Sequence, residues 1–212
     1  MTTTVIVPHF GSDALLDACV ASLHEHAPDA AQVIWDGNTA NHGFAGNCNR
    51  AAQLASTKPD DVLVFLNNDC TVRAGWLEPL VYALGSHPIA GSLLFYPDGT
   101  IQHSGVTIIR GPNGVEGRNL TYWHPSGEIP AVTGASLAIK AGLFWQVGGF
   151  DEGFYNGNED VDLCLKATEA TGLPCWFAAE STATHLESAS GDERWVAVHK
   201  NIVRLNERWG DQ

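Results

Sequence analysis

A run of five apolar residues at 62–66 is the segment that most constrains the fold of this chain. Such a run is typical of a strand buried on both faces, because a strand with one solvated face alternates apolar and polar residues. Strand-like and helix-like segments alternate through the first half of the sequence, at 4–8, 13–24, 32–35, 44–55, 62–66, 76–84 and 89–95. This alternation predicts an α/β fold with a mainly parallel central sheet and helices on both faces. We expect Pro8 to end the first strand, since proline cannot continue a central strand.

The second half of the sequence has a looser pattern. A turn at 97–100 and a strand at 101–109 indicate a small hairpin. Residues 110–130 are rich in Gly, Pro and Asn, which predicts a long loop, and loops of that length are usually functional or mobile. Helical spacing returns at 159–171 and 195–209. The chain has 212 residues, so we expect all of it to form a single domain.

Acidic residues outnumber basic ones, with 24 Asp and Glu against 11 Lys and Arg, and the formal charge is −13. This charge disfavours binding to long stretches of nucleic acid or to anionic lipid, because both rely on Lys and Arg. It is compatible with a nucleotide whose diphosphate is neutralised by a metal ion. No apolar run reaches the roughly 18 residues of a membrane-spanning helix, and the N-terminus has no basic region. We therefore expect a cytosolic protein without a membrane span or a secretion signal.

The five cysteines are odd in number and widely spaced, and they include no Cys-x-x-Cys pair. This spacing argues against a thiolate zinc site and against a disulfide framework. We expect the cysteines to be buried thiols, because free cysteine packs as a small apolar side chain.

Three polar clusters follow predicted strands, at residues 9–11, 36–38 and 67–69. Ligands of parallel sheets bind beyond the carboxyl ends of the strands, so we expect these clusters to converge. Asp69 closes the third cluster and could hold Mg²⁺ or Mn²⁺ through its carboxylate oxygens. Taken alone, a turn residue is the simpler interpretation, because Asn and Asp favour turns through local hydrogen bonds.

Two further candidates lie in the second half of the chain. The sequence Asn158-Glu159-Asp160-Val161-Asp162 opens a helix, where acids complement the helix dipole for purely structural reasons. The same dipole should favour the ionised form of Asp160. The glycine-rich approach at 148–152 supports a functional role, since it lets the backbone come close to a ligand. His185 is the other candidate, although a single histidine is more often a structural residue than a ligand.

Together these motifs resemble glycosyltransferase family 2 with the GT-A fold, in its rhamnosyltransferase-like subgroup. The resemblance covers nearly the whole chain, and its most specific part is the signature from Gly148-Gly149-Phe150-Asp151-Glu152 to Glu159-Asp160-Val161-Asp162. The other matching segments, in order, are 5–8, 41–52, 66–69, 132–135, His185 and 201–210. The resemblance implies a nucleotide-binding half over about 1–96 and an acceptor-binding half over about 97–212.

The resemblance also implies roles for single residues. Asp160 matches the general base, and Asp69 and His185 match the ligands of a divalent metal, Mn²⁺ or Mg²⁺, that bridges the donor diphosphate. Gly134 and Glu159 are the acceptor-binding positions. The nucleotide-diphosphate sugar donor, of UDP or dTDP type rather than GDP type, is expected to contact Pro8, Phe10, Asp36, Asn41, Gly46, Asn49 and Asn68.

These residue types suit the implied reaction, a single displacement with inversion at the anomeric carbon. A carboxylate near an acceptor hydroxyl takes its proton as the new C–O bond forms. A divalent ion acts as a Lewis acid for the charge that grows on the departing diphosphate. We expect the acceptor to be a glycan or another hydroxyl-bearing molecule.

Three features depart from the family pattern. Asn67 stands where the metal motif Asp-x-Asp has its first acid, residues 9–11 form an unusual first loop, and the Gln-x-x-Arg-Trp motif of processive enzymes is missing. Two other functions stay open. One is a nucleotidyltransferase, although residues 8–13 lack the basic glycine-rich loop of those enzymes, and the other is a non-catalytic carbohydrate-binding domain, supported only by seven tryptophans.

Overall fold

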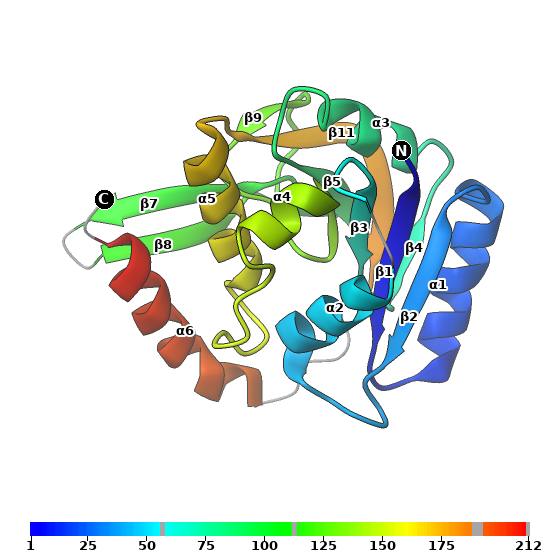
Figure 1. Cartoon of the computed structure of the whole chain (residues 1–212), viewed down its shortest axis with the longest axis horizontal. Coiled ribbons are helices and arrows are strands. Elements are labelled where there is room, and N and C mark those ends of the chain that lie inside the picture. The colour runs from blue at the N-terminus through cyan, green and yellow to red at the C-terminus, as the bar shows by residue number, and fades with distance from the viewer. Residues whose placement is uncertain (56–57, 112–113, 188–192, 211–212) are drawn as a thin grey trace.

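The computed structural model describes residues 1–55, 58–111, 114–187 and 193–210, and its elements are labelled in Figure 1. The strands are β1 (Thr3–His9), β2 (Ala31–Asp36), β3 (Val62–Leu66), β4 (Cys70–Val72), β5 (Ile89–Phe95), β6 (Ile101–His103), β7 (Val106–Gly111), β8 (Gly114–Asn119), β9 (Gly127–Ile129), β10 (Ser136–Lys140) and β11 (Cys175–His185). The helices are α1 (Asp13–His26), α2 (Gly43–Leu54), α3 (Leu77–Ala83), α4 (Ala141–Gln146), α5 (Glu159–Thr171) and α6 (Glu193–Trp209). None of these helices is long and apolar enough to cross a membrane.

Most of the described strands join one mixed sheet in the order β2-β1-β3-β10-β5-β11-β4, with β6 beside β5 and β9 beside β11. Strands β2, β1, β3, β5 and β11 run in one direction, while β10 and β4 run in the other. The expected α/β architecture with mostly parallel central strands is confirmed. β10 is an antiparallel insertion from the second half of the chain, between β3 and β5, that the sequence pattern did not predict.

Alternate residues of β3 enter two separate cores, one on each face of the sheet. Leu63 and Phe65 belong to the core covered by α2, α4 and α5. Val62, Val64 and Leu66 belong to the core covered by α1 and α3. Full burial of an aliphatic or phenyl side chain contributes about 1.5–3 kcal/mol. A strand covered on both faces has no position for a polar residue, which explains the continuous apolar run.

The prediction that Pro8 ends the first strand is wrong, because β1 continues through Pro8 to His9. The pairing explains how the sheet tolerates this proline. β1 is paired with β2 from Thr4 to His9, whereas its pairing with β3 covers only Thr3 to Ile6. Pro8 lacks a backbone N–H to donate, and it lies beyond the last residue of β1 that is paired with β3.

The predicted long loop at 110–130 is also wrong over its first part, where β7 and β8 form an antiparallel hairpin and β9 follows. The glycines that suggested a loop let this hairpin approach its neighbours closely. A Cβ at Gly117 would lie 3.2 Å from Val106 and Val161, and one at Gly114 (φ +101°) would overlap the Asn206 side chain. Pro112 and Asn113, which contributed to the loop prediction, lie outside the described residues.

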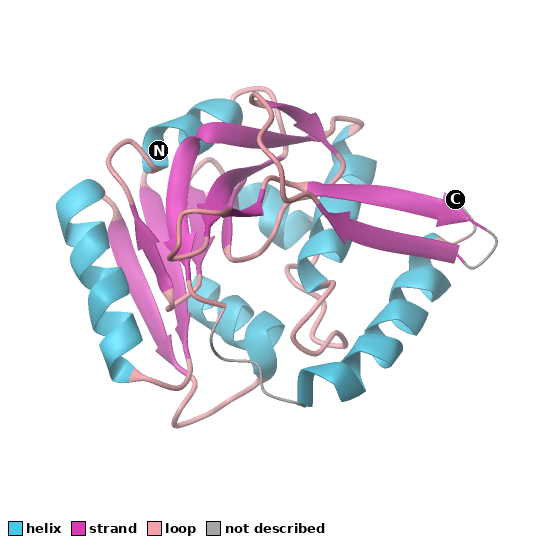
Figure 2. Ribbon diagram, turned by 180° about the vertical axis from the view of Figure 1, so that it is seen from behind, coloured by secondary structure: helices cyan, strands magenta, loops and turns pink. Residues whose placement is uncertain are grey.

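Helix α6 lies beside the β7–β8 hairpin, which projects from the main sheet (Figures 1 and 2). The side chain of Asn206 joins the two, because its Oδ1 accepts from the N–H of Val115 at 2.5 Å and its Nδ2 donates to the Val115 carbonyl at 3.2 Å. Arg208 donates to both carboxylate oxygens of Asp162 on α5, at 2.9 and 3.0 Å. The C-terminal helix therefore connects the hairpin to the helix that begins with Glu159.

Candidate functional site

A cleft of about 360 Å³ opens where β1 and β3 end and where α5 begins. Two of the three polar clusters expected to converge, those after β1 and β3, line this cleft. The cluster at 36–38, at the end of β2, contributes no residue to the cleft wall. The lining residues are Pro8, Phe10, Asn41, Phe44, Asn47, Asn67, Asn68, Asp69, Thr133, Gly134, Ala135, Tyr155, Asn156, Gly157, Glu159, Asp160, His185 and Glu187. Nine of the twelve residues selected from sequence line this one cleft, namely Pro8, Phe10, Asn41, Asn68, Asp69, Gly134, Glu159, Asp160 and His185.

The other three selected residues, Asp36, Gly46 and Asn49, lie outside the cleft lining. Asp36 is exposed at the end of β2 and accepts a 2.9 Å hydrogen bond from the N–H of Asn38. Asn49 is buried, where its side chain accepts from the N–H of Phe150 at 3.0 Å and donates to the Phe150 carbonyl at 2.8 Å. Gly46 lies in α2 against the side chain of Arg50. These contacts give Asn49 a structural task, and the nucleotide contacts of all three residues stay predictions.

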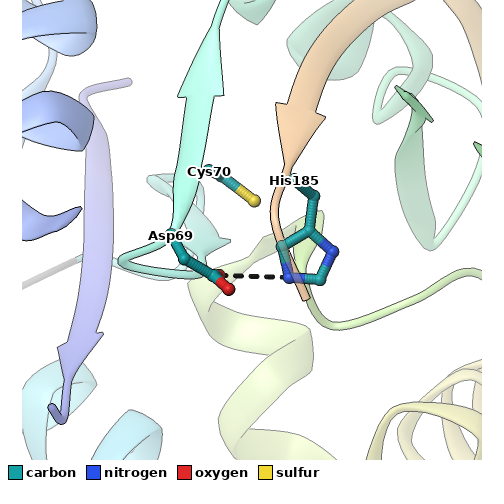
Figure 3. A group of neighbouring side chains, drawn as sticks. All are labelled: Asp69, Cys70 and His185. Atoms are coloured by element: carbon teal, nitrogen blue, oxygen red, sulfur yellow. Dashed lines mark ion pairs between the residues drawn. The ribbon is translucent and has the colours of Figure 1, made fainter. Parts of the chain in front are cut away.

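The side chains of Asp69 and His185 lie next to each other in the cleft wall, although the two residues are far apart in the sequence (Figure 3). His185 is the last residue of β11 and pairs with Cys70 of β4, so the sheet register itself brings its side chain next to Asp69. Nε2 of His185 lies 3.1 Å from Oδ1 of Asp69 and 3.3 Å from Nδ2 of Asn67. On its other side, Nδ1 of His185 lies 2.7 Å from Oε1 of Gln102.

The side chain of Cys70 also points toward this pair in Figure 3. Burial raises its pKa well above the ordinary value of 9.0, and the thiol donates to the carbonyl of Ala135 at 3.5 Å. The thiol is thus engaged with the backbone in the metal-free protein, and our metal assignment rests on Asp69 and His185. All five cysteines are free and buried, as expected from the sequence.

The residues around Asp69 fit a divalent cation. A carboxylate oxygen and an imidazole nitrogen form a donor pair that suits Mn²⁺. The side-chain oxygen Oδ1 of Asn67 is buried and has no hydrogen-bond partner among the described residues. A buried amide oxygen without a partner costs about 1–3 kcal/mol, and a cation or a water bound to it would remove that cost. The asparagine that replaces the first acid of the metal motif thus still offers an oxygen atom.

Asp160 faces the cleft from the first turn of α5. Its Oδ2 accepts a 2.9 Å hydrogen bond from the N–H of Gly134, and its Oδ1 accepts from the N–H of Val161 at 2.8 Å. Burial raises the pKa of this carboxyl group, and the hydrogen bonds from Gly134, Val161 and the Thr133 side chain oppose the increase. The prediction that the helix start favours the ionised form is therefore wrong in its net direction, because desolvation outweighs the donors. A raised pKa makes the carboxylate a stronger base once it is ionised.

The acids at the start of α5 have different surroundings. Asp162 is fully buried and accepts hydrogen bonds from Arg208 and, at 3.0 Å, from Nε1 of Trp209, so it holds α5 against α6. Glu159 lines the cleft and accepts from the N–H of Gly157 at 2.5 Å. Asn158, directly before α5, makes no side-chain cap and has a left-handed backbone (φ +68°).

Sequence reasoning missed several lining residues and one supporting residue. Asn156 and Gly157 line the cleft, and their Asn-Gly dipeptide is a turn signal that could have marked this loop. Asn156 has a left-handed backbone (φ +48°), and its Oδ1 accepts from the N–H of Phe44 at 3.0 Å. Gln102 supports His185 from behind, across 83 positions of sequence, and no local pattern indicates it.

The sequence of this chain is similar to that of a known protein family and of several known proteins. The sequence model of glycosyl transferase family 2 matches residues 17–134, which is more than half of the chain. O-antigen biosynthesis protein RfbC of Myxococcus xanthus is 35% identical over 181 residues, which cover 77% of this chain and 13% of that protein. Inactive polypeptide N-acetylgalactosaminyltransferase-like protein 5 of Mus musculus is 26% identical over 185 residues, covering 74% of this chain and 41% of that protein. The chain thus spans less than half the length of these relatives.

The crystal structure of GalNAc-T7 with UDP, GalNAc and Mn²⁺ matches the fold with a TM-score of 0.76 at 18% sequence identity. The match covers 99% of this chain and 49% of that chain. This likeness confirms the GT-A fold expected from the sequence, while the rhamnosyltransferase-like subgroup stays a prediction. With the family match over residues 17–134, the chain belongs to glycosyl transferase family 2.

Proposed function

We propose that this chain is an inverting, metal-dependent glycosyltransferase that moves a sugar from a nucleotide diphosphate to an acceptor hydroxyl. One observation carries the proposal: Asp69, His185 and Asp160, which come from three distant parts of the sequence, line the same cleft. A metal-dependent nucleotide-sugar transferase needs a cation site and a base, and the residues of this cleft include candidates for both.

Asp69 and His185 would hold Mn²⁺ or Mg²⁺ through one carboxylate oxygen and one imidazole nitrogen. When bound, the ion would supply Lewis-acid stabilisation for the charge on the departing diphosphate. Asn67 would add its partnerless oxygen, directly or through water. The crystal structure of GalNAc-T7 contains Mn²⁺, which supports this metal assignment by analogy of fold.

The donor would occupy the part of the cleft formed by the first half of the chain. Pro8, Phe10, Asn41 and Asn68 line this part, and the Phe10 side chain is 48% exposed, so its ring is free to contact a base. We assign the donor to the UDP or dTDP type rather than the GDP type, with UDP supported by its presence in the GalNAc-T7 structure. Asp36 lies at the end of the neighbouring strand and would contact the nucleotide base from there.

The acceptor would enter from the side of Gly134 and Glu159, next to Asp160. Asp160 would take the proton of the acceptor hydroxyl while that oxygen attacks the anomeric carbon and the nucleotide diphosphate departs. A base contributes about 10²–10⁴-fold to such a step. Gly134 would keep the carboxylate aimed into the cleft through its N–H, and half-burial of Asp160 would limit competition from water.

A donor panel tests the proposal. UDP-, dTDP- and GDP-sugars are incubated with the protein and Mn²⁺ or Mg²⁺, and release of the nucleotide diphosphate is measured with and without an acceptor glycan. Release from one donor class that stops in EDTA supports the proposal. If the wild type binds nucleotide as Asp160→Asn does but releases no nucleotide diphosphate from any donor, the chain is instead a binding domain.

A further inference from the structure

Gln102, on the short strand β6, makes two hydrogen bonds to the same residue. Its Nε2 donates to the backbone carbonyl of His185 at 3.2 Å, and its Oε1 faces Nδ1 of His185 at 2.7 Å. Gln102 is only 5% exposed, so water does not compete for these hydrogen-bonding atoms. A primary amide suits this position, because it offers one donor and one acceptor side by side.

These two hydrogen bonds determine that Nδ1 of the His185 ring carries a hydrogen. A backbone carbonyl only accepts, so the NH₂ group of Gln102 must face it, and Oε1 must then face Nδ1 of His185. An amide oxygen also only accepts, so Nδ1 must carry a hydrogen. Nε2, 3.1 Å from Oδ1 of Asp69, is then the nitrogen left to bind a cation, which would displace any hydrogen that Nε2 shares with this carboxylate.

The opposite assignment fails at both atoms. Turning the amide by half a rotation would set Oε1 against the carbonyl of His185 and would set Nε2 against Nδ1. With the hydrogen moved to Nε2, the ring would offer its lone pair to Gln102, away from Asp69 and Asn67. Histidine ligands of metals usually donate their second nitrogen to such an outer partner, which fixes the tautomer and the ring orientation.

We infer that Gln102 is a positioning residue that keeps a hydrogen on Nδ1 of His185 and leaves Nε2 as the nitrogen that faces the cation site beside Asp69. This inference rests on the proposed function of Asp69 and His185 as metal ligands. Gln102 does not touch the ion or the substrate, and it acts only through the ring of His185. The hydrogen bond from Nδ1 to Gln102 and the ring orientation are set in the metal-free protein, so Nε2 faces the site before an ion arrives.

The first test uses the wild-type protein alone. Two-bond ¹⁵N–¹H correlation spectra of the metal-free protein, at a mildly alkaline pH, distinguish the histidine tautomers, and a His185→Gln sample assigns the signals. The expected result is hydrogen on Nδ1. A ring with hydrogen on Nε2 alone overturns the inference, and this readout does not depend on a variant of Gln102 folding.

The second test measures affinity for Mn²⁺ by electron paramagnetic resonance, without nucleotide or substrate. Gln102→Met and Gln102→Glu both lose the donor to the His185 carbonyl, but only Glu keeps an acceptor for Nδ1–H. We expect Gln102→Met to weaken Mn²⁺ binding by about 10–100-fold. Gln102→Glu should stay within a few-fold of the wild type, and equal losses in the two variants would overturn the inference.

Asn119→Leu is the matched control for a general loosening of β6. The Nδ2 of Asn119 donates to the backbone carbonyl of Gln102 at 2.9 Å, and its side chain makes no contact with the His185 ring among the described interactions. This variant should bind Mn²⁺ like the wild type, and a loss equal to that of Gln102→Met would overturn the inference. Wild-type protein that binds no Mn²⁺ would reject the proposed metal site, while the spectra would still decide the tautomer.

Discussion

The backbone N–H of Gly134 donates a 2.9 Å hydrogen bond to Oδ2 of Asp160, which ties the start of α5 to the loop that leads into β10. A Cβ at Gly134 would lie 3.0 Å from the ring of Phe44, so a side chain at this position would crowd that ring. One oxygen of Asp160 is thus directed by the loop and the other by the helix backbone, and the carboxylate has a fixed orientation toward the cleft.

Asp160→Asn should lower kcat by about 10²–10⁴-fold, because an amide cannot accept the proton of the acceptor. Binding of the nucleotide, measured by calorimetry with UDP or dTDP, should change little, since the donor-side residues are untouched. Glu159→Gln is the matched comparison, because the neighbouring acid also opens α5. If the two variants lose equal activity, the acids serve the helix start and Asp160 is not the base.

The acid limb of the kcat/KM profile should lie above pH 3.8, the ordinary pKa of an aspartate, because burial raises the pKa of Asp160. The base acts only when ionised, so activity falls as the pH drops through this raised pKa. Thr133→Val removes a hydrogen bond that lowers the pKa, and it should move the acid limb to still higher pH. A limb that moves the other way in Thr133→Val would contradict this explanation.

Asp69→Ala should abolish Mn²⁺ binding and lower kcat/KM by about 10²-fold or more, since Lewis-acid stabilisation is worth several kcal/mol. Cys70→Ser tests whether the neighbouring thiol takes part, and it should retain Mn²⁺ affinity, because the neutral thiol is not a ligand in our assignment. Excess EDTA should stop transfer in the wild type, and added Mn²⁺ should restore it. Full activity in EDTA would remove the metal from the mechanism.

The free energy of unfolding should fall as the pH drops from about 6.5 to about 4, because of His103. Burial lowers the pKa of His103 to about 4, so the unfolded chain binds a proton over this range and the folded chain does not. The stability contributed by the neutral ring is complete above pH 6.5 and is lost below it, by about 3 kcal/mol in all. His103→Gln should flatten this dependence in urea titrations at several pH values, and an unchanged slope would assign it to other groups.

Much of the fold was predictable because its signals are local. The apolar run of β3 and the helical spacing of α5 reflect burial that each segment carries in its own sequence, and both elements were predicted with the bounds they have. β10 was not predicted, since its partners β3 and β5 lie far away in the sequence. The predicted strand at 101–109 covers most of β7, but the sequence predicts a loop where β8 lies, because glycine also serves close packing, as Gly117 shows against Val161.

The candidate site was likewise predictable only in part. Asp69 and Asp160 were found because each sits at a recognisable end of a strand or helix, and the structure places both in one cleft. The pKa of Asp160 could not be predicted, because it depends on how far the folded chain desolvates the carboxyl group. Gln102 could not be found either, since its contact with His185 exists only through the pairing of β6 with β5 and of β5 with β11.

Asn206 recognises the β7–β8 hairpin only through the backbone of Val115, and Gly114 leaves the space that its side chain fills. The exposed side chains of Glu116 and Arg118 on β8 can therefore be exchanged without loss of this docking contact. An engineer who wishes to graft a hairpin from a related protein onto this position should transfer Gly114 and Asn206 as a unit. The pair behaves as an attachment point, and the surface that it carries is open to redesign.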